Sequence, residues 1–192
     1  MDILTLIKKR ASIRKYKPKK IPCKKIKLII EAGIWGPSIH HFQPWKFIVV
    51  EKKYIINKIA KIVLKKFKKI NVPSFIFYPT ITVLTNAQLM ICVYNTKKLT
   101  KYLKKYNKIY FKKVGLVEIS AISASIQNMI LTAESLGIGS CWLDMPLLCS
   151  KEINNLLNME EELAAVITFG YPNQKGIRSH RSPIYETVKY IK

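Results

Sequence analysis

Four arginines stand out in a chain that otherwise uses lysine for its positive charge. Lys and Arg together number 34, and the arginines form one pair near each end, Arg10 with Arg14 and Arg178 with Arg181. A guanidinium is planar and can donate two parallel hydrogen bonds, which suits the oxygens of a phosphate. In an extended segment, Arg10, Ser12 and Arg14 point to the same side. These residues predict an anion site; the alternative is a solvated basic turn.

A second candidate is the loop from Gly36 to Trp45. Its glycine and prolines exclude a continuous helix. Ser38, His40, His41 and Gln43 bring several hydrogen-bond donors and acceptors into this short segment. The loop is either a connection that satisfies its own backbone or one wall of a ligand site.

A third candidate is the turn from Gly137 to Gly139, at the end of a helix expected from Glu118 to Leu136. Apolar residues repeat on one face of this helix and Ser and Ala on the other, which suits either the core or a subunit interface. The two glycines free the backbone, and exposed amides here could face a ligand. A dinucleotide-binding fingerprint would need a third glycine and a preceding strand, so a Rossmann fold is not indicated.

The remaining elements are predicted from hydrophobic periodicity. We expect the Val72-Pro73 and Tyr78-Pro79 dipeptides to interrupt regular structure, and Ile184 to Ile191 to form an edge strand. Helices are expected at 2–9, 24–34, 53–69, 100–113 and 150–157, and buried strands at 46–51, 89–94 and 163–169.

Length and composition indicate a single domain. A chain of 192 residues with 49% hydrophobic content can bury one core. No uninterrupted apolar run reaches the roughly 18 residues that span a membrane, and no signal sequence is seen, so we expect a cytoplasmic protein without membrane contact. The four cysteines form no C-x-x-C pair, which indicates reduced thiols and no metal site.

The net charge of +23 raises the question of nucleic acid as a partner. In the basic stretches 61–69 and 97–113, lysines alternate with apolar residues at helical spacing, which is typical of a solvated helix face. A basic nucleic-acid-binding protein is therefore kept only as an alternative, and we do not expect nucleic acid to be a partner.

Several separated stretches resemble the FMN-dependent nitroreductase family. Arg10-Ala-Ser-Ile-Arg14 is similar to the family's N-terminal R-x-S-x-R motif, and the loop from Gly36 to Trp45 resembles its P-S-x-x-N-x-Q-P-W loop. Gln127 to Trp142 is similar to the family's long helix and Gly-rich end. Gly170-Tyr-Pro with Arg181 resembles its C-terminal signature. Only about residues 52–115 remain unmatched.

The resemblance implies the fold and the assembly. We expect one α+β domain over residues 1–192 with the nitroreductase-like three-layer fold, in which helices flank a central, mostly antiparallel sheet. In the family, two chains form an intertwined homodimer with the FMN sites at the subunit interface, and the C-terminal tail wraps the partner.

The resemblance also implies the roles of the candidate residues. Arg10, Ser12 and Arg181 would bind the FMN phosphate, with Ala11 in the same motif and Arg178 as an additional partner. Arg14 would lie near the pyrimidine edge of the flavin, where negative charge collects on reduction. The backbone of Gly137, Ile138 and Gly139 would face the flavin ring. From the other subunit would come Pro37, Ser38, His40, His41 and Gln43, with His41 in place of the family's asparagine.

The activity implied is an oxidoreductase in which the flavin performs the chemistry and no side chain is an obligatory acid or base. NADH or NADPH would give hydride to FMN and leave, and an acceptor such as a nitroaromatic or a quinone would then take its place, in ping-pong order. The alternative within this fold is a flavin-binding protein with a specialised reductase activity or none.

Overall fold

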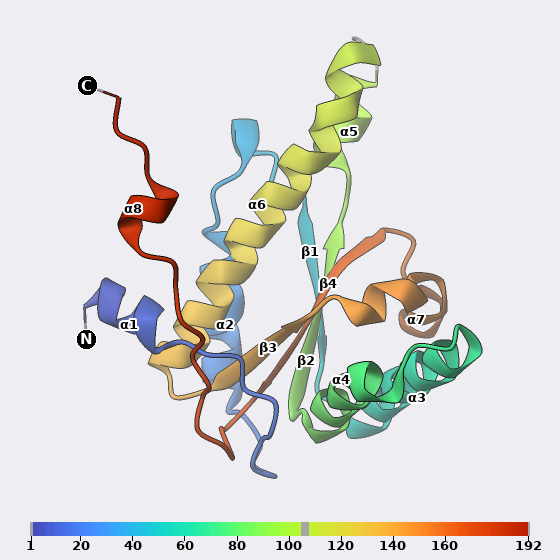
Figure 1. Ribbon diagram of the computed structural model, residues 1–192. Helices are drawn as coiled ribbons and strands as arrows, with labels where there is room; N and C mark the ends of the chain where they lie inside the picture. Colours follow the sequence, from blue (N-terminus) through green and yellow to red (C-terminus); the bar gives the residue numbers. More distant parts are fainter. Residues whose placement is uncertain (1, 105–107, 192) are drawn as a thin grey trace.

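The computed structural model describes residues 2–104 and 108–191, which form an α+β domain (Figure 1). Most predicted elements are present, with ends shifted by a few residues. The elements in chain order are α1 (Ile3–Lys9), α2 (Cys23–Ile34), η1 (Ile39–His41), β1 (Trp45–Val50), α3 (Lys53–Lys69), α4 (Ser74–Asn86), β2 (Leu89–Asn95), α5 (Lys98–Leu103), α6 (Lys108–Ser135), β3 (Gly139–Leu143), η2 (Met145–Cys149), α7 (Ser150–Leu157), β4 (Glu162–Gly170) and α8 (Ile184–Thr187).

A four-stranded antiparallel sheet in the order β1-β2-β4-β3 is the centre of the domain. All seven residues of β2 are buried, and successive side chains point to opposite faces of the sheet. Met90, Cys92 and Tyr94 pack on one face, and their neighbours Leu89, Ile91 and Val93 pack on the other. The sheet therefore separates two apolar cores, as the three-layer expectation requires.

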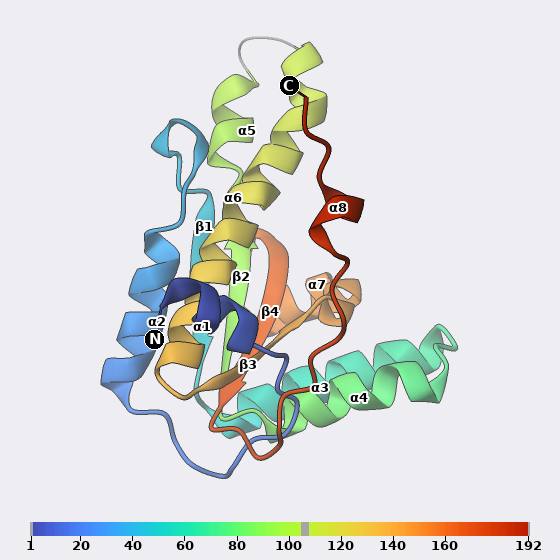
Figure 2. The ribbon, with the colours of Figure 1, turned by 60° about the vertical axis from the view of Figure 1, so that its left-hand side comes forward.

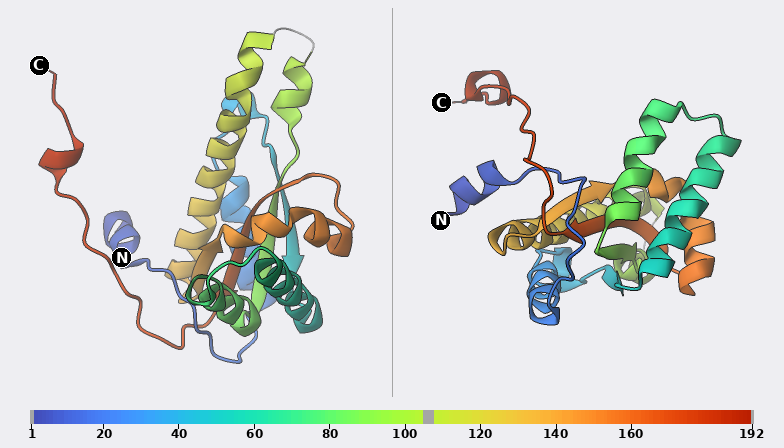
Figure 3. Two further views of the ribbon diagram at one scale, coloured as in Figure 1. Left: turned by 45° about the vertical axis from the view of Figure 1, so that its right-hand side comes forward. Right: turned by 90° about the horizontal axis from the view of Figure 1, so that it is seen from below.

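Helices α2 and α6 cover one face of the sheet, and α3, α4 and α7 cover the other, as the view from below shows (Figure 3). Helices α2 and α6 pack closely. A Cβ on Gly33 of α2 would lie only 2.7 Å from Cγ of Met129 in α6, so glycine permits this approach. The Ser125 hydroxyl also donates a hydrogen bond to the Gly33 carbonyl oxygen at 2.7 Å. The small residues of α6 predicted from the sequence thus serve close packing within the domain.

The segment Val114–Ser135 of α6 is long and apolar enough to span a membrane by length and composition alone. In the fold it packs against α2 and the sheet, and several of its side chains belong to the core, including Ile122, Ile126 and Met129. Its composition is accounted for by its place as the central helix of this layer.

Several sequence predictions need correction. Tyr78-Pro79 does not interrupt regular structure, since Pro79 lies inside α4, whereas Val72-Pro73 does separate α3 from α4. The long helix is already present at Lys108, the first residue described after 105–107, and so starts before the predicted Glu118. The helix expected at 100–113 is represented by α5 and the first turns of α6, and its residues 105–107 lie outside the described part of the chain.

Two further corrections concern the strands. The residues that follow the predicted turn from Gly137 to Gly139 were not expected to form a strand, but Gly139–Leu143 is the edge strand β3, paired with β4 from Gly139 opposite Gly170. The segment Ile184 to Ile191 is not an edge strand. It contains the short helix α8 and stands away from the body of the domain (Figures 1 and 3).

Candidate functional site

The segment that follows α1 runs along the outer edge of the sheet. Ser12 forms a parallel bridge with Ser140 of β3, and the Ile13 amide donates to the Ser140 carbonyl oxygen at 2.9 Å. The Ile13 side chain is buried, whereas Arg10 and Ser12 are half-buried and Arg14 is exposed. This alternation places Arg10, Ser12 and Arg14 on one side, the arrangement predicted from the sequence.

Tyr16 anchors this segment to the sheet. Its buried hydroxyl donates to the Ile13 carbonyl oxygen at 2.6 Å and lies 2.9 Å from Oγ1 of Thr168 in β4. Burial raises the pKa of Tyr16 above its usual value, so the phenol stays neutral and able to donate. A Cβ on Gly170 would lie 2.6 Å from the Tyr16 ring, so only glycine permits this contact.

The C-terminal segment crosses the N-terminal one and brings the second arginine pair to the first (Figure 2). The Asn173 amide donates to the Lys15 carbonyl oxygen at 2.9 Å. Gly176 passes so close that a Cβ on it would lie 2.6 Å from Cβ of Ala11. Ala11 is therefore buried beneath the C-terminal segment, and its place in the site is that of a small residue that permits this crossing.

The two segments enclose a cavity of about 640 Å³ that reaches Gln127 of α6. All four arginines of the chain line it, and in the described residues none of the four guanidinium groups forms an ion pair with a carboxylate. Unpaired guanidinium groups around one cavity favour a bound anion. The side chains that line the cavity and can donate to an anion include Lys8, Arg10, Ser12, Arg14, Arg178, Ser179 and Arg181.

The positive charge of this cavity extends to Cys141 on β3. Burial raises the pKa of the Cys141 thiol, and the nearby Arg14 and Arg10 act in the opposite direction. Burial therefore disfavours the thiolate form of Cys141.

The turn predicted to face a ligand forms the C-terminal end of α6. The Gly137 amide donates to the Glu134 carbonyl oxygen at 3.1 Å, and the Ile138 amide donates to that of Ala133 at 2.8 Å. Gly137 has a φ of 72°, which glycine adopts without strain. Both amides are therefore engaged at the helix end.

Gly139 acts through its small size. A Cβ on Gly139 would lie 2.7 Å from Cγ1 of Ile13, so this glycine lets the arginine-bearing segment pack directly on β3. In this chain Gly137, Ile138 and Gly139 are not among the residues that line the arginine cavity.

The loop from Gly36 to Trp45 has an unusual backbone. His40, His41 and Gln43 have φ values of 44°, 57° and 47°, in the left-handed region that non-glycine residues seldom adopt. The Gln43 amide donates to Oγ of Ser38 at 3.1 Å, and the side chains of His41 and Gln43 are 3.1 Å apart at their Nε2 atoms. Left-handed backbone at three of the four residues from His40 to Gln43 is a kind of strain that clusters at functional sites.

This loop does not reach the arginine cavity of its own chain. It lies beside α5 and the N-terminal half of α6, whereas the arginine-bearing segment lies beside α1 near the other end of α6 (Figure 1). Pro37, His40 and His41 are exposed. Within one chain, the structure thus brings together the arginines and Ser12, and it keeps Pro37, Ser38, His40, His41 and Gln43 apart from them.

Sequence reasoning missed two contributions to the site. Gln127 of α6, Lys8 and Ser179 line the arginine cavity; no sequence signal singled out Gln127, since the same helix carries other uncharged polar residues such as Asn128 and Thr132. A second cavity of about 520 Å³ shares Arg14 and Ile177 with the first and is lined by Phe75 and Tyr78 of α4. The α4 residues were missed because Pro79 was taken to exclude a helix there.

Comparison with known proteins identifies a matching family and several relatives. The model of the family described as "Nitroreductase family" matches residues 7–171. A protein of Methanothermobacter thermautotrophicus, provisionally named NADH dehydrogenase/NAD(P)H nitroreductase, is 30% identical over 176 residues, which cover 90% of this chain and 78% of the relative.

Two solved structures are similar over the whole chain. A BluB-like flavoprotein from Clostridium difficile 630 is 26% identical with a TM-score of 0.85, and each chain is covered fully. A provisionally named nitroreductase from Desulfovibrio desulfuricans, solved in complex with FMN, is 26% identical with a TM-score of 0.76, and 100% of this chain and 98% of the other are covered.

Proposed function

The chain belongs to the nitroreductase family, and from this premise we propose that it is an FMN-dependent oxidoreductase that transfers hydride from NADH or NADPH to a small-molecule acceptor. The observation that carries the proposal is the cavity that all four arginines line without an ion-pair partner in the described residues. The chain has 34 Lys and Arg residues, and all four of its arginines lie around this one cavity.

The residues of this cavity fit FMN. Arg10, Ser12 and Arg181 offer the donors that a phosphate needs, and Arg178 adds a further guanidinium. Arg14 lines both this cavity and the neighbouring one on α4, so it lies where a ligand with a phosphate at one end and an aromatic ring at the other would pass. When bound, FMN supplies the ability to accept and return a hydride. The Arg14 charge would stabilise negative charge on its pyrimidine edge.

The overall reaction is balanced between donor and acceptor. NAD(P)H is oxidised to NAD(P)⁺ and gives up a hydride, which is two electrons and one proton. A quinone takes up the two electrons and two protons to become a hydroquinone, with the second proton from solvent. Donor and acceptor use the site in turn, in ping-pong order, and nitroaromatics and quinones are the acceptor classes that we propose. No protein side chain is assigned as an acid or a base.

The site is completed in a homodimer. The strained loop with Pro37, Ser38, His40, His41 and Gln43 does not reach the arginine cavity of its own chain, and it is exposed where a second copy could receive it. The C-terminal segment after Pro183 adds large exposed apolar side chains, among them Tyr185, Tyr190 and Ile191. We infer that these surfaces meet a second chain and that FMN binds between the two.

The experiment that tests the proposal is a titration of the purified protein with FMN, followed by flavin fluorescence. We expect Arg10→Ala/Arg181→Ala to weaken FMN binding at least about 100-fold, because each guanidinium loses charge-assisted hydrogen bonds to the phosphate. The matched control is Lys65→Ala/Lys69→Ala, which removes two exposed charges from α3, and it should bind FMN as the unmodified protein does. Equal losses in the two variants would contradict a specific phosphate site.

A further inference from the structure

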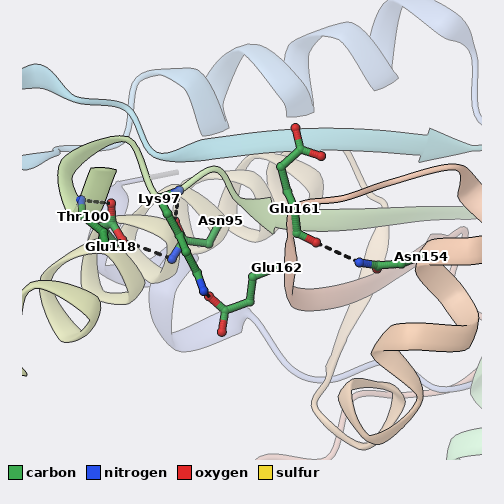
Figure 4. A network of polar contacts seen from close by, with 7 residues as sticks. All are labelled: Asn95, Lys97, Thr100, Glu118, Asn154, Glu161 and Glu162. Atoms are coloured by element: carbon green, nitrogen blue, oxygen red, sulfur yellow. Dashed lines mark hydrogen bonds and ion pairs between the residues drawn. The ribbon is translucent and has the colours of Figure 1, made fainter. Parts of the chain in front are cut away.

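A buried carboxylate on α6 holds the short helix α5 in place. Glu118 is 1% exposed, and its two oxygens accept four hydrogen bonds from described residues. Oε1 accepts from the amides of Leu99 at 2.9 Å and Thr100 at 3.1 Å. Oε2 accepts from the Thr100 hydroxyl at 2.8 Å and from the Asn95 side-chain amide at 3.3 Å. Figure 4 shows the carboxylate between the start of α5 and the end of β2.

Helix α5 depends on this carboxylate for its first turn. The residue before the helix, Lys97, is in the left-handed region with a φ of 54° and provides no side-chain cap. A helix of six residues is too short to be stable alone, and its first amides need acceptors. Glu118 supplies them from another helix, and the positive end of the α5 dipole favours its charge.

Among the side chains that the structure describes, at 2–104 and 114–191, no basic group forms an ion pair with Glu118. The Lys97 ammonium lies 3.1 Å from Glu162, in an ion pair that is about half exposed, and Figure 4 shows it extending away from Glu118. A buried carboxylate without a cation carries a large desolvation cost, which the four donors offset. An arrangement of this kind fixes geometry more than it adds net stability.

The position of α5 sets one wall of an apolar cavity of about 540 Å³. It is lined by Leu99, Tyr102 and Leu103 of α5, by Val114 and Val117 of α6, and by Ile39, Phe42 and one polar residue, His40, of the strained loop. The Tyr102 and Phe42 rings are 5.4 Å apart between centroids, so α5 and the loop are in direct contact. These walls suit an aromatic or aliphatic ring and not a phosphate.

We propose that Glu118 is a positioning residue that sets the shape of this cavity, and that the cavity receives the apolar ring of the electron acceptor. This inference rests on the proposed function, because the loop that closes the cavity is the one assigned to the partner's FMN site. Glu118 touches neither acceptor nor cofactor and acts through α5.

The first measurement is hydrogen–deuterium exchange at the amides of Leu99 and Thr100, which reports on α5 whether or not flavin is bound. We expect Glu118→Ala to speed exchange at these amides about tenfold or more, because their acceptor is removed. Glu118→Gln keeps one acceptor oxygen, so its exchange rate at these amides should lie between those of the unmodified protein and Glu118→Ala. Glu162→Ala removes the exposed ion pair beside α5 and should leave exchange unchanged. Unchanged exchange in Glu118→Ala would overturn the positioning role.

The second measurement separates the cavity from the flavin. In Glu118→Ala with full FMN content, we expect KM for an apolar nitroaromatic to rise about tenfold, while KM for ferricyanide, which needs no apolar cavity, stays within about twofold. Thr100→Val removes only the hydroxyl donor, so it gives a milder variant if Glu118→Ala does not fold. Faster exchange with the same KM change for both acceptors would contradict the cavity as the acceptor site, whereas absence of bound flavin would contradict the proposed function itself.

Discussion

At the scale of single residues, the arginines and the strained loop carry the chemistry that the sequence made visible. The arginines were predictable because a guanidinium in a lysine-rich chain marks a need for bidentate hydrogen bonds. Their convergence from positions 10, 14, 178 and 181 was implied only by the family resemblance, because in the fold it depends on Gly176 crossing over Ala11. The left-handed backbone at His40 could not be predicted either, because histidine occurs in all backbone conformations and does not mark a left-handed position as glycine does.

His41 is the residue at which the sequence differs from the family's loop. Its φ of 57° is more easily adopted by asparagine than by most residues. We expect His41→Asn to keep the free energy of unfolding and the FMN affinity, because the amide also offers a donor and an acceptor. His41→Val should lower the free energy of unfolding by about 1–2 kcal/mol. Urea unfolding at fixed protein concentration measures the free energy of unfolding of both variants. Equal values for the two variants would show that the loop changes its backbone to accommodate valine and that the left-handed conformation is not required.

At the scale of elements, close backbone approaches place the arginine segment. Gly139→Ala would put a Cβ 2.7 Å from Ile13, and we expect a loss of about 1–3 kcal/mol in the free energy of unfolding together with weaker FMN binding. The matched control is Gly115→Ala in α6, where a Cβ would meet nothing within 4 Å; helix propensity there favours alanine by about 0.5–1 kcal/mol. Similar effects of both substitutions on thermal unfolding would contradict the close approach at Gly139.

The elements that sequence reasoning missed have physical causes. Pro79 removes one amide from α4, but Phe75, whose carbonyl would accept from it, lies on an exposed turn where water can substitute. Strand β3 contains few β-branched residues, and it is a strand because β4 and the segment at Ser12 pair with it. By contrast, β2 and β4 are continuous apolar runs, so their place in the sheet centre was predictable.

At the scale of the whole molecule, exposed apolar side chains gather on α1, on the tail and near the loop. Ile3 is 72% exposed, Trp35 79% and Ile191 91%, which is unusual for large apolar residues on a monomer. These values agree with the proposal that a second copy covers this surface. The sequence alone pointed to the dimer only through the family resemblance.

The proposed dimer predicts complementation between two defective variants. The variant Arg10→Ala/Arg181→Ala lacks the two arginines proposed to bind the FMN phosphate, here called the clamp. The variant Ser38→Ala/Gln43→Ala lacks the proposed contacts of the loop with FMN. Neither homodimer should therefore bind FMN tightly. In mixed dimers, one of the two sites combines an intact clamp with an intact loop. Co-expression in equal amounts should therefore restore about a quarter of the FMN sites, measured as flavin per chain. No recovery would indicate that clamp and loop act within one chain.

The central claim, that this chain is an FMN oxidoreductase, is tested most directly by the visible spectrum of the protein with FMN before and after NADH or NADPH is added without oxygen. The account predicts a bound flavin whose absorbance is bleached by one or both donors and returns when a quinone is added. Bound flavin that neither donor bleaches would indicate a flavin-binding protein without reductase turnover. A protein that takes up no FMN at all would contradict the account.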